Sequence, residues 1–344
     1  MNGAHSEQRV QTVCLLLLTT AVMAASLYWL RPVMIPFVLA LLFALILSPL
    51  IDLQMRYLRA PRAVALIGTI LLGFLALLFV GAVVSDSVNQ LAGNVQAYKE
   101  HLDSVLQSAA QRLPLERFGI DPNRGVSSLI EVPVQTVGRM LLGTTNAILD
   151  LLSRGLLVLV FLLFLLTGEG FSGRSEETTS GQVAAQIKRY VLAQAVISAA
   201  TGVLVGASLA LLGVPLALLF GFLAFLLNFI PTIGSIVATL LPLPMVLISP
   251  DATLATVALV LAIPGLIQFT IGNIIAPKVM GDTLDLHPVT ILLALMIWGM
   301  LWGIPGALLA TPITAIVKLM LTRMELTAPL SNWMAGRFSA AAAQ

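Results

Sequence analysis

The side chains of this chain that could bind a solute are uncharged and lie beside breaks in long apolar runs. Pro, Gly and Asn interrupt two of these runs, at 228–234 and at 302–306. A broken membrane helix frees backbone N–H and C=O groups, which are tolerated only inside protein or against a wet cavity. Paired interrupted segments therefore point to the binding site of a transporter. The candidate pathway residues beside the breaks are Asn228, Thr232, Ser235, Gln268, Asn273 and Thr311.

The breaks themselves are assigned to proline and glycine. Proline lacks the backbone N–H and clashes with the preceding turn of a helix, and glycine permits close backbone approach or positive φ. The expected helix breaks are at Pro231, Gly234, Pro277, Gly281, Gly303, Pro305, Gly306 and Pro312. Because every candidate pathway residue is uncharged, this lining suits a neutral polar solute or a hydrated passage better than a multivalent ion.

Each of these polar residues also has a structural interpretation. Ser and Thr in membrane helices commonly bond to their own backbone or to a neighbouring helix, and we favour that role for Ser235 and Thr311. An amide is costlier to bury in lipid, because an unpaired one loses about 2–7 kcal/mol. For Asn228, Gln268 and Asn273 a helix-to-helix bond and a role in the pathway both remain open.

The residues offer no pattern of catalytic chemistry. A membrane zinc protease would carry His-Glu-x-x-His, whereas the histidines His5, His101 and His287 are far apart in the sequence. Asp150 precedes Arg154 by four positions, the helical spacing of an ion pair. No Gly-x-x-x-x-Gly-Lys nucleotide motif occurs. We therefore expect a protein that is not an enzyme and has no cofactor and no metal site.

Composition assigns the chain to the membrane. Its 344 residues are 58% hydrophobic and 10% charged, and the stretch from 190 to 277 contains one formal charge, Asp251. Soluble domains are about 25% charged, so such a stretch is expected to be solvated by a lipid bilayer. The net charge of +2 gives no indication of nucleic-acid binding. The single Cys14 excludes a disulfide framework within the chain.

The predicted fold is an all-α polytopic membrane protein with about seven or eight transmembrane helices, given that about 20 apolar residues cross a bilayer. The clear candidates are 11–30, 33–51, 63–85, 143–167, 191–212 and 252–277. The runs 215–249 and 289–322 are broken near 228–235 and 303–312. Each of these two is either a re-entrant hairpin or a tight pair of spans.

Four regions follow from this reading. They are an N-terminal three-span unit (1–85), a polar amphipathic segment (86–142), a C-terminal transport core (143–325) and a short cytoplasmic tail (326–344). The distribution of Lys and Arg predicts that both termini are cytoplasmic. Apolar residues between 88 and 109 recur every three or four positions, which indicates a helix that packs on its own membrane domain or on a second subunit.

The C-terminal half resembles the autoinducer-2 exporter family of bacterial permeases, the PerM-like proteins. The matching segments, in chain order, are Asn228-Phe-Ile-Pro-Thr-Ile-Gly234, Gln268-Phe-Thr-Ile-Gly-Asn273, Pro277-Lys-Val-Met-Gly281, Leu286-His-Pro288, Trp298-Gly-Met-Leu-Trp-Gly-Ile-Pro-Gly306 and Ala310-Thr-Pro312. The N-terminal half is similar only in its layout of hydrophobic spans.

The resemblance implies a multi-pass protein of the bacterial inner membrane that exports a small polar solute, autoinducer-2 or a related metabolite, by a gradient-driven or facilitative mechanism. It also implies a homo-oligomer and is compatible with a pentamer. Some relatives are described as sodium(or lithium)/proton antiporters, which is the first alternative, and a non-transporting membrane scaffold is the second. Many members have an acidic residue before the Pro of Asn-x-x-x-Pro, where this chain has Ala276. That departure weakens the antiporter alternative.

Overall fold

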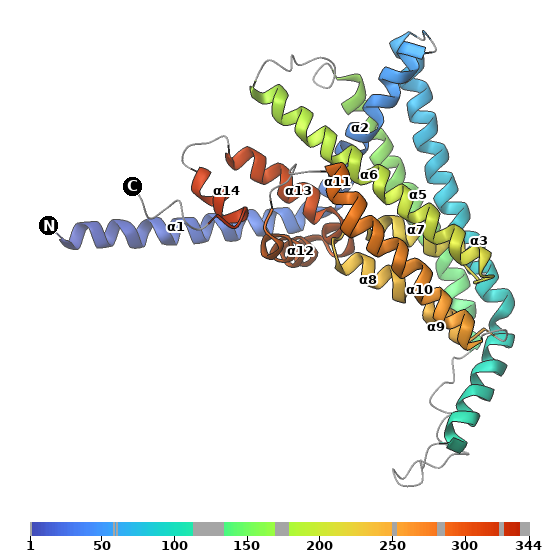
Figure 1. Cartoon of the computed structure of the whole chain (residues 1–344). Helices are drawn as coiled ribbons and strands as arrows, with labels where there is room; N and C mark the ends of the chain where they lie inside the picture. The colour runs from blue at the N-terminus through green and yellow to red at the C-terminus, as the bar shows by residue number, and fades with distance from the viewer. Residues whose placement is uncertain are drawn as a thin grey trace. The chain divides into compact units, whose positions relative to one another are not determined.

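The described residues form helices joined by turns and short connections. The computed structural model describes residues 2–57, 59, 61–112, 134–168, 179–249, 253–280, 286–322 and 327–337. The α-helices, labelled in Figure 1, are α1 (Asn2–Trp29), α2 (Arg31–Tyr57), α3 (Arg62–Arg112), α5 (Val134–Thr167), α6 (Thr179–Leu211), α7 (Ala217–Leu227), α8 (Ile233–Leu240), α9 (Leu243–Leu247), α10 (Leu254–Thr270), α11 (Ala276–Met280), α12 (Pro288–Trp302), α13 (Ile304–Thr322) and α14 (Ala328–Met334). The π-helical turn η3 (Ile271–Ile275) lies between α10 and α11.

The described helices are those of a polytopic membrane protein. Five of them are long and apolar enough to span a bilayer: Arg31–Tyr57, Arg62–Asn94, Ala185–Leu211, Leu254–Met280 and Ile304–Thr322. Large apolar side chains on them remain uncovered by protein, and Leu211 is 89% exposed. Such side chains are stable when lipid surrounds them. The expected spans 33–51, 63–85, 191–212 and 252–277 fall on four of the five.

The other expected spans lie in helices with shorter described apolar stretches. The predicted spans 11–30 and 143–167 lie in α1 and α5, whose apolar stretches are Leu17–Trp29 and Leu152–Thr167. The helix predicted at 88–109 belongs to the long α3. Its side chains at 95–99 and 101–112 are outside the described residues, as is the loop that follows. The predicted tail contains one described helix, α14.

The helices form two compact units. Unit 1 comprises Met1–Leu66, Leu157–Leu192 and Asp282–Gln344, and unit 2 comprises Ile67–Leu156 and Ala193–Gly281. In unit 1, α2 packs against α5 through Ala40 and Ala44, which are fully buried next to Leu162. The small alanine side chains, one turn apart, allow the two helices to approach closely.

The second predicted break joins α12 to α13 within unit 1. Gly303 lies between them with φ 67° and ψ −145°, a conformation that only glycine adopts readily. A Cβ atom on Gly306 would collide with the carbonyl oxygen of Trp298, so glycine is required for the close approach of the two helices. The indole N–H of Trp302 donates to Leu27 O over 3.0 Å, which ties this hairpin to α1.

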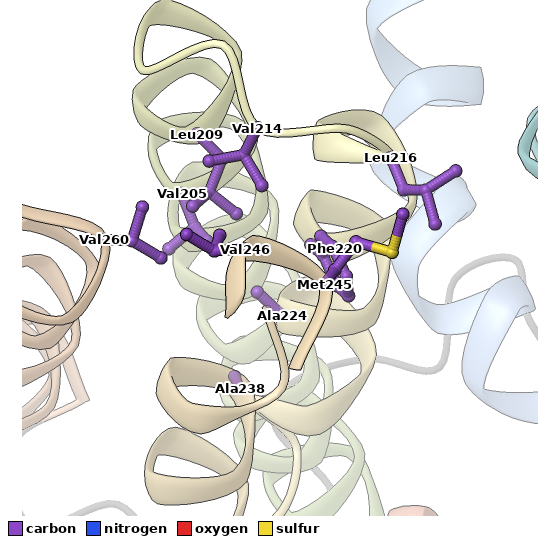
Figure 2. Close-up of a cluster of buried hydrophobic side chains, with 10 residues drawn as sticks. All are labelled: Val205, Leu209, Val214, Leu216, Phe220, Ala224, Ala238, Met245, Val246 and Val260. Atoms are coloured by element: carbon purple, nitrogen blue, oxygen red, sulfur yellow. The ribbon is translucent and has the colours of Figure 1, made fainter. Parts of the chain in front are cut away.

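Unit 2 is built on contacts between helix backbones. Gly202 and Gly206, one turn apart on α6, lie against Gly221 of α7, where a Cβ atom would be 2.7 Å from Gly202 O and 2.8 Å from Gly206 Cα. The adjoining core contains ten buried side chains from five helices and their connections (Figure 2), which are Val205, Leu209, Val214, Leu216, Phe220, Ala224, Ala238, Met245, Val246 and Val260. This packing holds the short helices that surround the first predicted break.

The helices on either side of the first break are too short to cross a membrane. α7 has 11 residues, and the apolar stretch after the break is Ile233–Leu247, which contains α8 and α9. These arms are about 16 Å and about 22 Å long at 1.5 Å per residue. The hydrocarbon core of a bilayer is about 30 Å thick. The segment is therefore a broken hairpin, as predicted near 228–235, and each of its arms is shorter than the hydrocarbon core.

Two predicted breaks are wrong. The helical run from Leu254 to Met280 continues through Pro277, and α13 continues through Pro312. A proline within a membrane helix is tolerated where neighbouring groups or a local change of helix type accommodate its missing N–H. At Pro277 the accommodation is the π-helical turn η3, which directly precedes α11. The predicted break at Gly281 lies outside the described residues.

Candidate functional site

Unit 2 contains a cavity of about 540 Å³, within the usual range for small-molecule sites. Its walls come from α6, the turn between α7 and α8, α8 itself, and the run α10–η3–α11. The lining residues are Gln194, Ile197, Asn228, Pro231, Thr232, Ser235, Ile236, Thr239, Leu240, Gly265, Gln268, Phe269, Ile271, Gly272, Asn273, Ala276 and Met280.

A hydrogen-bond network attaches the turn after α7 to α6. Asn228 Nδ2 donates to Ser198 Oγ over 3.0 Å, and Gln194 Nε2 donates to the main-chain oxygen of Asn228 over 2.8 Å. Gln194 Nε2 also lies 3.4 Å from Ser198 Oγ. Ser198 is fully buried, whereas Gln194 and Asn228 border the cavity. The amide nitrogen of Asn228 is thus used in a structural bond, while its side chain still borders the cavity.

The same turn contains a strained residue at the cavity wall. Thr232 has φ 64° and ψ −59°, and Ile233 N donates to Pro231 O over 2.7 Å. This is a γ-turn with positive φ, a rare conformation for a residue with a side chain. Such strain costs about 1–3 kcal/mol and is concentrated at ligand clamps and switch regions. The Thr232 main-chain oxygen accepts from Ile236 N over 3.2 Å in the first turn of α8, and Thr232 lines the cavity.

Gly234 allows α8 to begin directly against the end of α7. A Cβ atom at this position would collide with the carbonyl oxygen of Leu227 and lie 3.3 Å from Ile230 Cβ. Ser235 follows at the cavity wall, and its main-chain oxygen accepts a hydrogen bond from Thr239 Oγ1 over 2.9 Å. Glycine is therefore required at this position, because a side chain would collide with the end of α7. Ser235 and Thr239, which follow it, line one side of the cavity.

Gln268 is the lining residue with unsatisfied polar atoms. Its side chain is 4% exposed, and neither Nε2 nor Oε1 has a hydrogen-bond partner among the residues that the structure describes. Leaving a buried polar group unpaired costs about 1–3 kcal/mol. The two amide atoms are covered by protein in this structure, so a polar solute in the cavity could bind them only after the side chain turns toward the cavity.

Asn273 reaches the same cavity from the π-helical turn. The N–H of Ala276 donates to the oxygen of Ile271, the bond between residues five apart that defines a π turn. In a regular α-helix the ring of Pro277 would clash with the carbonyl of residue 273, and the wider turn relieves that clash. Asn273 Nδ2 donates to Phe269 O over 3.0 Å.

The structure thus brings together five of the six candidate pathway residues. Asn228, Thr232, Ser235, Gln268 and Asn273 all line the cavity of unit 2. Thr311 lies in α13, which belongs to unit 1, and is buried there. Of the expected breaks, Pro231 lines the cavity, and Gly303, Pro305 and Gly306 lie at the α12–α13 turn.

Three features were missed by reasoning from the sequence. Ser198 was not identified as a partner of the first break, although a polar residue one turn after Gln194 on an apolar helix is a usable signal. The glycines of the α6–α7 contact have the Gly-x-x-x-Gly spacing of close membrane-helix packing. The π turn could have been suspected from Pro277, since π turns occur where an α-helix must be relieved locally.

The cavity is electrically neutral. None of the described residues that line it has an ionisable side chain. Arg154 Nε lies 2.9 Å from Asp150 Oδ1, the ion pair that the spacing predicts, and both side chains are exposed and lie outside this lining. Among the described residues no three His, Cys, Asp or Glu side chains come together as metal ligands would. The arrangement can therefore offer hydrogen bonds and apolar contacts to a small uncharged solute.

Comparison with known proteins gives matches along most of the chain. The family model described as AI-2E family transporter matches residues 17–325. The AI-2 transport protein TqsA of Escherichia coli (strain K12) is 31% identical over 311 residues, which are 84% of this chain and 85% of that protein. YhhT of the same strain is 28% identical over 316 residues, 89% of each chain. A Mycobacterium tuberculosis transport protein, MT0215, is 30% identical over 304 residues, 82% of this chain and 80% of that one.

Proposed function

Because this chain belongs to the AI-2E family of transporters, we propose that it carries a small, neutral, polar solute across the bacterial inner membrane by way of the cavity in unit 2. The observation that carries this proposal is Gln268, a residue of the cavity wall whose buried amide atoms have no protein partner among the described residues. A solute that hydrogen-bonds to this amide would remove its desolvation penalty.

Autoinducer-2 is the first solute to test. The relative TqsA is named for AI-2 transport and covers most of this chain. The lining combines amides and hydroxyls with apolar side chains such as Ile236, Leu240 and Phe269. That mixture favours an uncharged molecule with a few hydrogen-bonding groups and some apolar surface.

The mechanism that the site supports best is facilitative. Coupling to protons normally requires an ionisable residue at the transport site, and the described lining has none. Many family members have an acidic residue at the position of Ala276, where a carboxylate could bind a cation or a proton. In this chain the cavity is lined there by alanine. Solute flux would then follow the solute's own concentration gradient.

The remaining assignments rest on the sequence pattern. We propose that both termini are cytoplasmic, because most Lys and Arg residues outside the 86–142 segment then face the cytoplasm. We also propose that the chain assembles as a homo-oligomer. Labelling of an engineered cysteine in the tail from each side of the membrane would test the first assignment, and mass measurement of the purified protein in detergent would test the second.

The decisive experiment is efflux of autoinducer-2 from proteoliposomes that contain the purified protein. We expect flux above that of protein-free liposomes, and a strong reduction for Gln268→Leu. The matched control is Leu266→Met, since Leu266 lies on the same helix, is exposed and does not line the cavity. The proposal is wrong if Gln268→Leu transports as well as the wild type.

A further inference from the structure

The turn that joins α2 to α3 carries a group of arginine side chains. Arg56 lies in the last turn of α2, Arg59 lies between the two helices, and Arg62 is the first residue of α3. All three residues are exposed, and no acidic residue occurs between positions 56 and 62. Like charges that are gathered on one short turn produce a strongly positive surface.

The helix α6 adds a further basic side chain next to this turn. Lys188 Nζ lies 3.8 Å from Oδ2 of Asp52, which precedes Arg56 by one turn of α2. All of these residues belong to unit 1. Asp52 is the one acidic residue of α2 and is paired with Lys188, so the excess of positive charge comes from the arginines. We refer to Arg56, Arg59, Arg62 and Lys188 as the basic patch.

The length of α2 places the basic patch at the level of lipid headgroups. The helix runs from Arg31 to Tyr57 and has 27 residues, which gives about 40 Å. A bilayer with its headgroup layers is about 40–45 Å thick. At the first end the guanidinium of Arg31 lies 4.4 Å from the centre of the Tyr28 ring, and at the second end Tyr57 adjoins the basic patch. Tyrosine is enriched at both membrane–water interfaces, so each end of α2 reaches a headgroup layer.

Arg59 is held in a backbone conformation that residues with a side chain rarely adopt. Its φ is 49°, in the left-handed region that glycine and asparagine occupy more readily than arginine. Backbone strain of this kind is concentrated at sites that hold ligands. The strain at Arg59 is therefore an observation, independent of the charge, that points to a ligand at this turn.

We propose that the basic patch binds the phosphate group of an anionic phospholipid in the adjoining headgroup layer. Guanidinium groups donate paired hydrogen bonds to phosphate oxygens in a matching geometry. Clusters of basic residues next to the ends of membrane helices are typical of anionic-lipid sites. The position of the patch at headgroup depth favours a lipid over a free phosphate ion. The site does not depend on the transported solute, and the proposed orientation assigns it to the cytoplasmic leaflet.

The test is thermal unfolding of the purified full-length protein in a neutral detergent with added lipid. A ligand that binds the folded state raises the unfolding midpoint. We expect phosphatidylglycerol to raise the midpoint of the wild type more than phosphatidylcholine does. The difference should shrink in high salt, because salt screens exposed charges. Inorganic phosphate, which distinguishes a free anion from a lipid, should give no comparable shift.

The decisive variant is Arg56→Gln combined with Arg59→Asn. It removes two positive charges from the basic patch, and asparagine tolerates the positive φ at position 59. We expect this variant to lose most of the phosphatidylglycerol shift. Its midpoint without lipid should stay level or rise, because the strain at position 59 is relieved. The control for lost positive charge is Arg31→Gln, at the opposite end of α2, which should keep the shift.

The proposal is wrong if the double variant keeps the full shift or if Arg31→Gln loses as much of it. A shift of the wild type by phosphatidylcholine or inorganic phosphate as large as that by phosphatidylglycerol also overturns it. Gel filtration shows whether each variant is folded, and Arg59→Asn alone replaces the double variant if the latter is not. Native mass spectrometry checks the same prediction directly, because phosphatidylglycerol should remain bound to the wild type and be lost from the variant.

Discussion

The side-chain amide of Gln194 donates to the main-chain oxygen of Asn228 over 2.8 Å and so attaches the broken hairpin to α6. The two residues are 34 positions apart in the sequence. This bond joins the wall made by α6 to the turn that presents Thr232 at the cavity. The shape of the cavity therefore depends on this hydrogen bond within the protein.

Loss of that bond should lower both stability and flux. Gln194→Met keeps the length of the side chain but has no donor, so we expect about 1–3 kcal/mol less stability and reduced solute efflux. The measurement is thermal unfolding in detergent together with proteoliposome efflux. Thr201→Val is the matched control, because Thr201 is also fully buried on α6 and its hydroxyl bonds only to its own helix at Ile197 O. Equal effects of the two variants would contradict the role of Gln194.

Replacement of Gln268 should affect stability and flux in opposite directions. Gln268→Leu replaces an unpaired buried amide with an apolar side chain of similar size, which removes a cost of about 1–3 kcal/mol. We expect the thermal midpoint to stay level or rise while efflux falls. A parallel fall in both quantities would show that the amide is part of the fold.

The backbone strain at Thr232 can be separated from its hydroxyl group. Thr232→Gly and Thr232→Ala both remove the hydroxyl, but only glycine adopts positive φ without strain. We expect the glycine variant to be more stable than the alanine variant by about 1 kcal/mol, and both to transport less than the wild type. Thermal unfolding gives the first comparison and efflux the second. A more stable alanine variant would mean that the turn is not strained.

Gly234 should not tolerate a side chain. Gly234→Ala places a methyl group against Leu227 O, so α8 must shift, at a cost of about 1–3 kcal/mol. The readouts are the yield of monodisperse protein and its thermal midpoint. Gly272→Ala serves as the control for stability, because a Cβ atom there would meet no atom within 4 Å. If both alanine variants unfold at the wild-type temperature, the close approach of α7 and α8 is not required.

Solute flux should be insensitive to an imposed proton gradient. The described cavity lining has no ionisable side chain that could exchange a proton with the solute site. Efflux of autoinducer-2 at equal internal and external pH should match efflux under a gradient, and Asp150→Asn should leave it unchanged. Acceleration by the gradient that Asp150→Asn abolishes would instead favour an antiporter.

Several aspects of this protein follow from local sequence alone. The membrane class follows from a mean hydropathy of +1.00 and from long runs without charge, because the lipid preference of a segment depends on its own side chains. The breaks at Pro231 and Gly303 were also predictable, since proline removes a backbone donor and glycine permits positive φ, although the helices at Pro277 and Pro312 continue despite their prolines. The candidate pathway residues could be predicted as a group, because they lie next to these breaks in the sequence.

Tertiary structure alone decided which of those residues form a site. Thr311 has the same chemistry as Thr232 but lies in a different unit. The bond between Gln194 and Asn228 and the unpaired amide of Gln268 both depend on helices that are far apart in the chain. Asn273 lines the cavity within a π turn, whose bond from Ala276 N to Ile271 O is not evident from local sequence. Hydrogen-bond satisfaction depends on which neighbours folding brings within about 3 Å, and that information is absent from local composition.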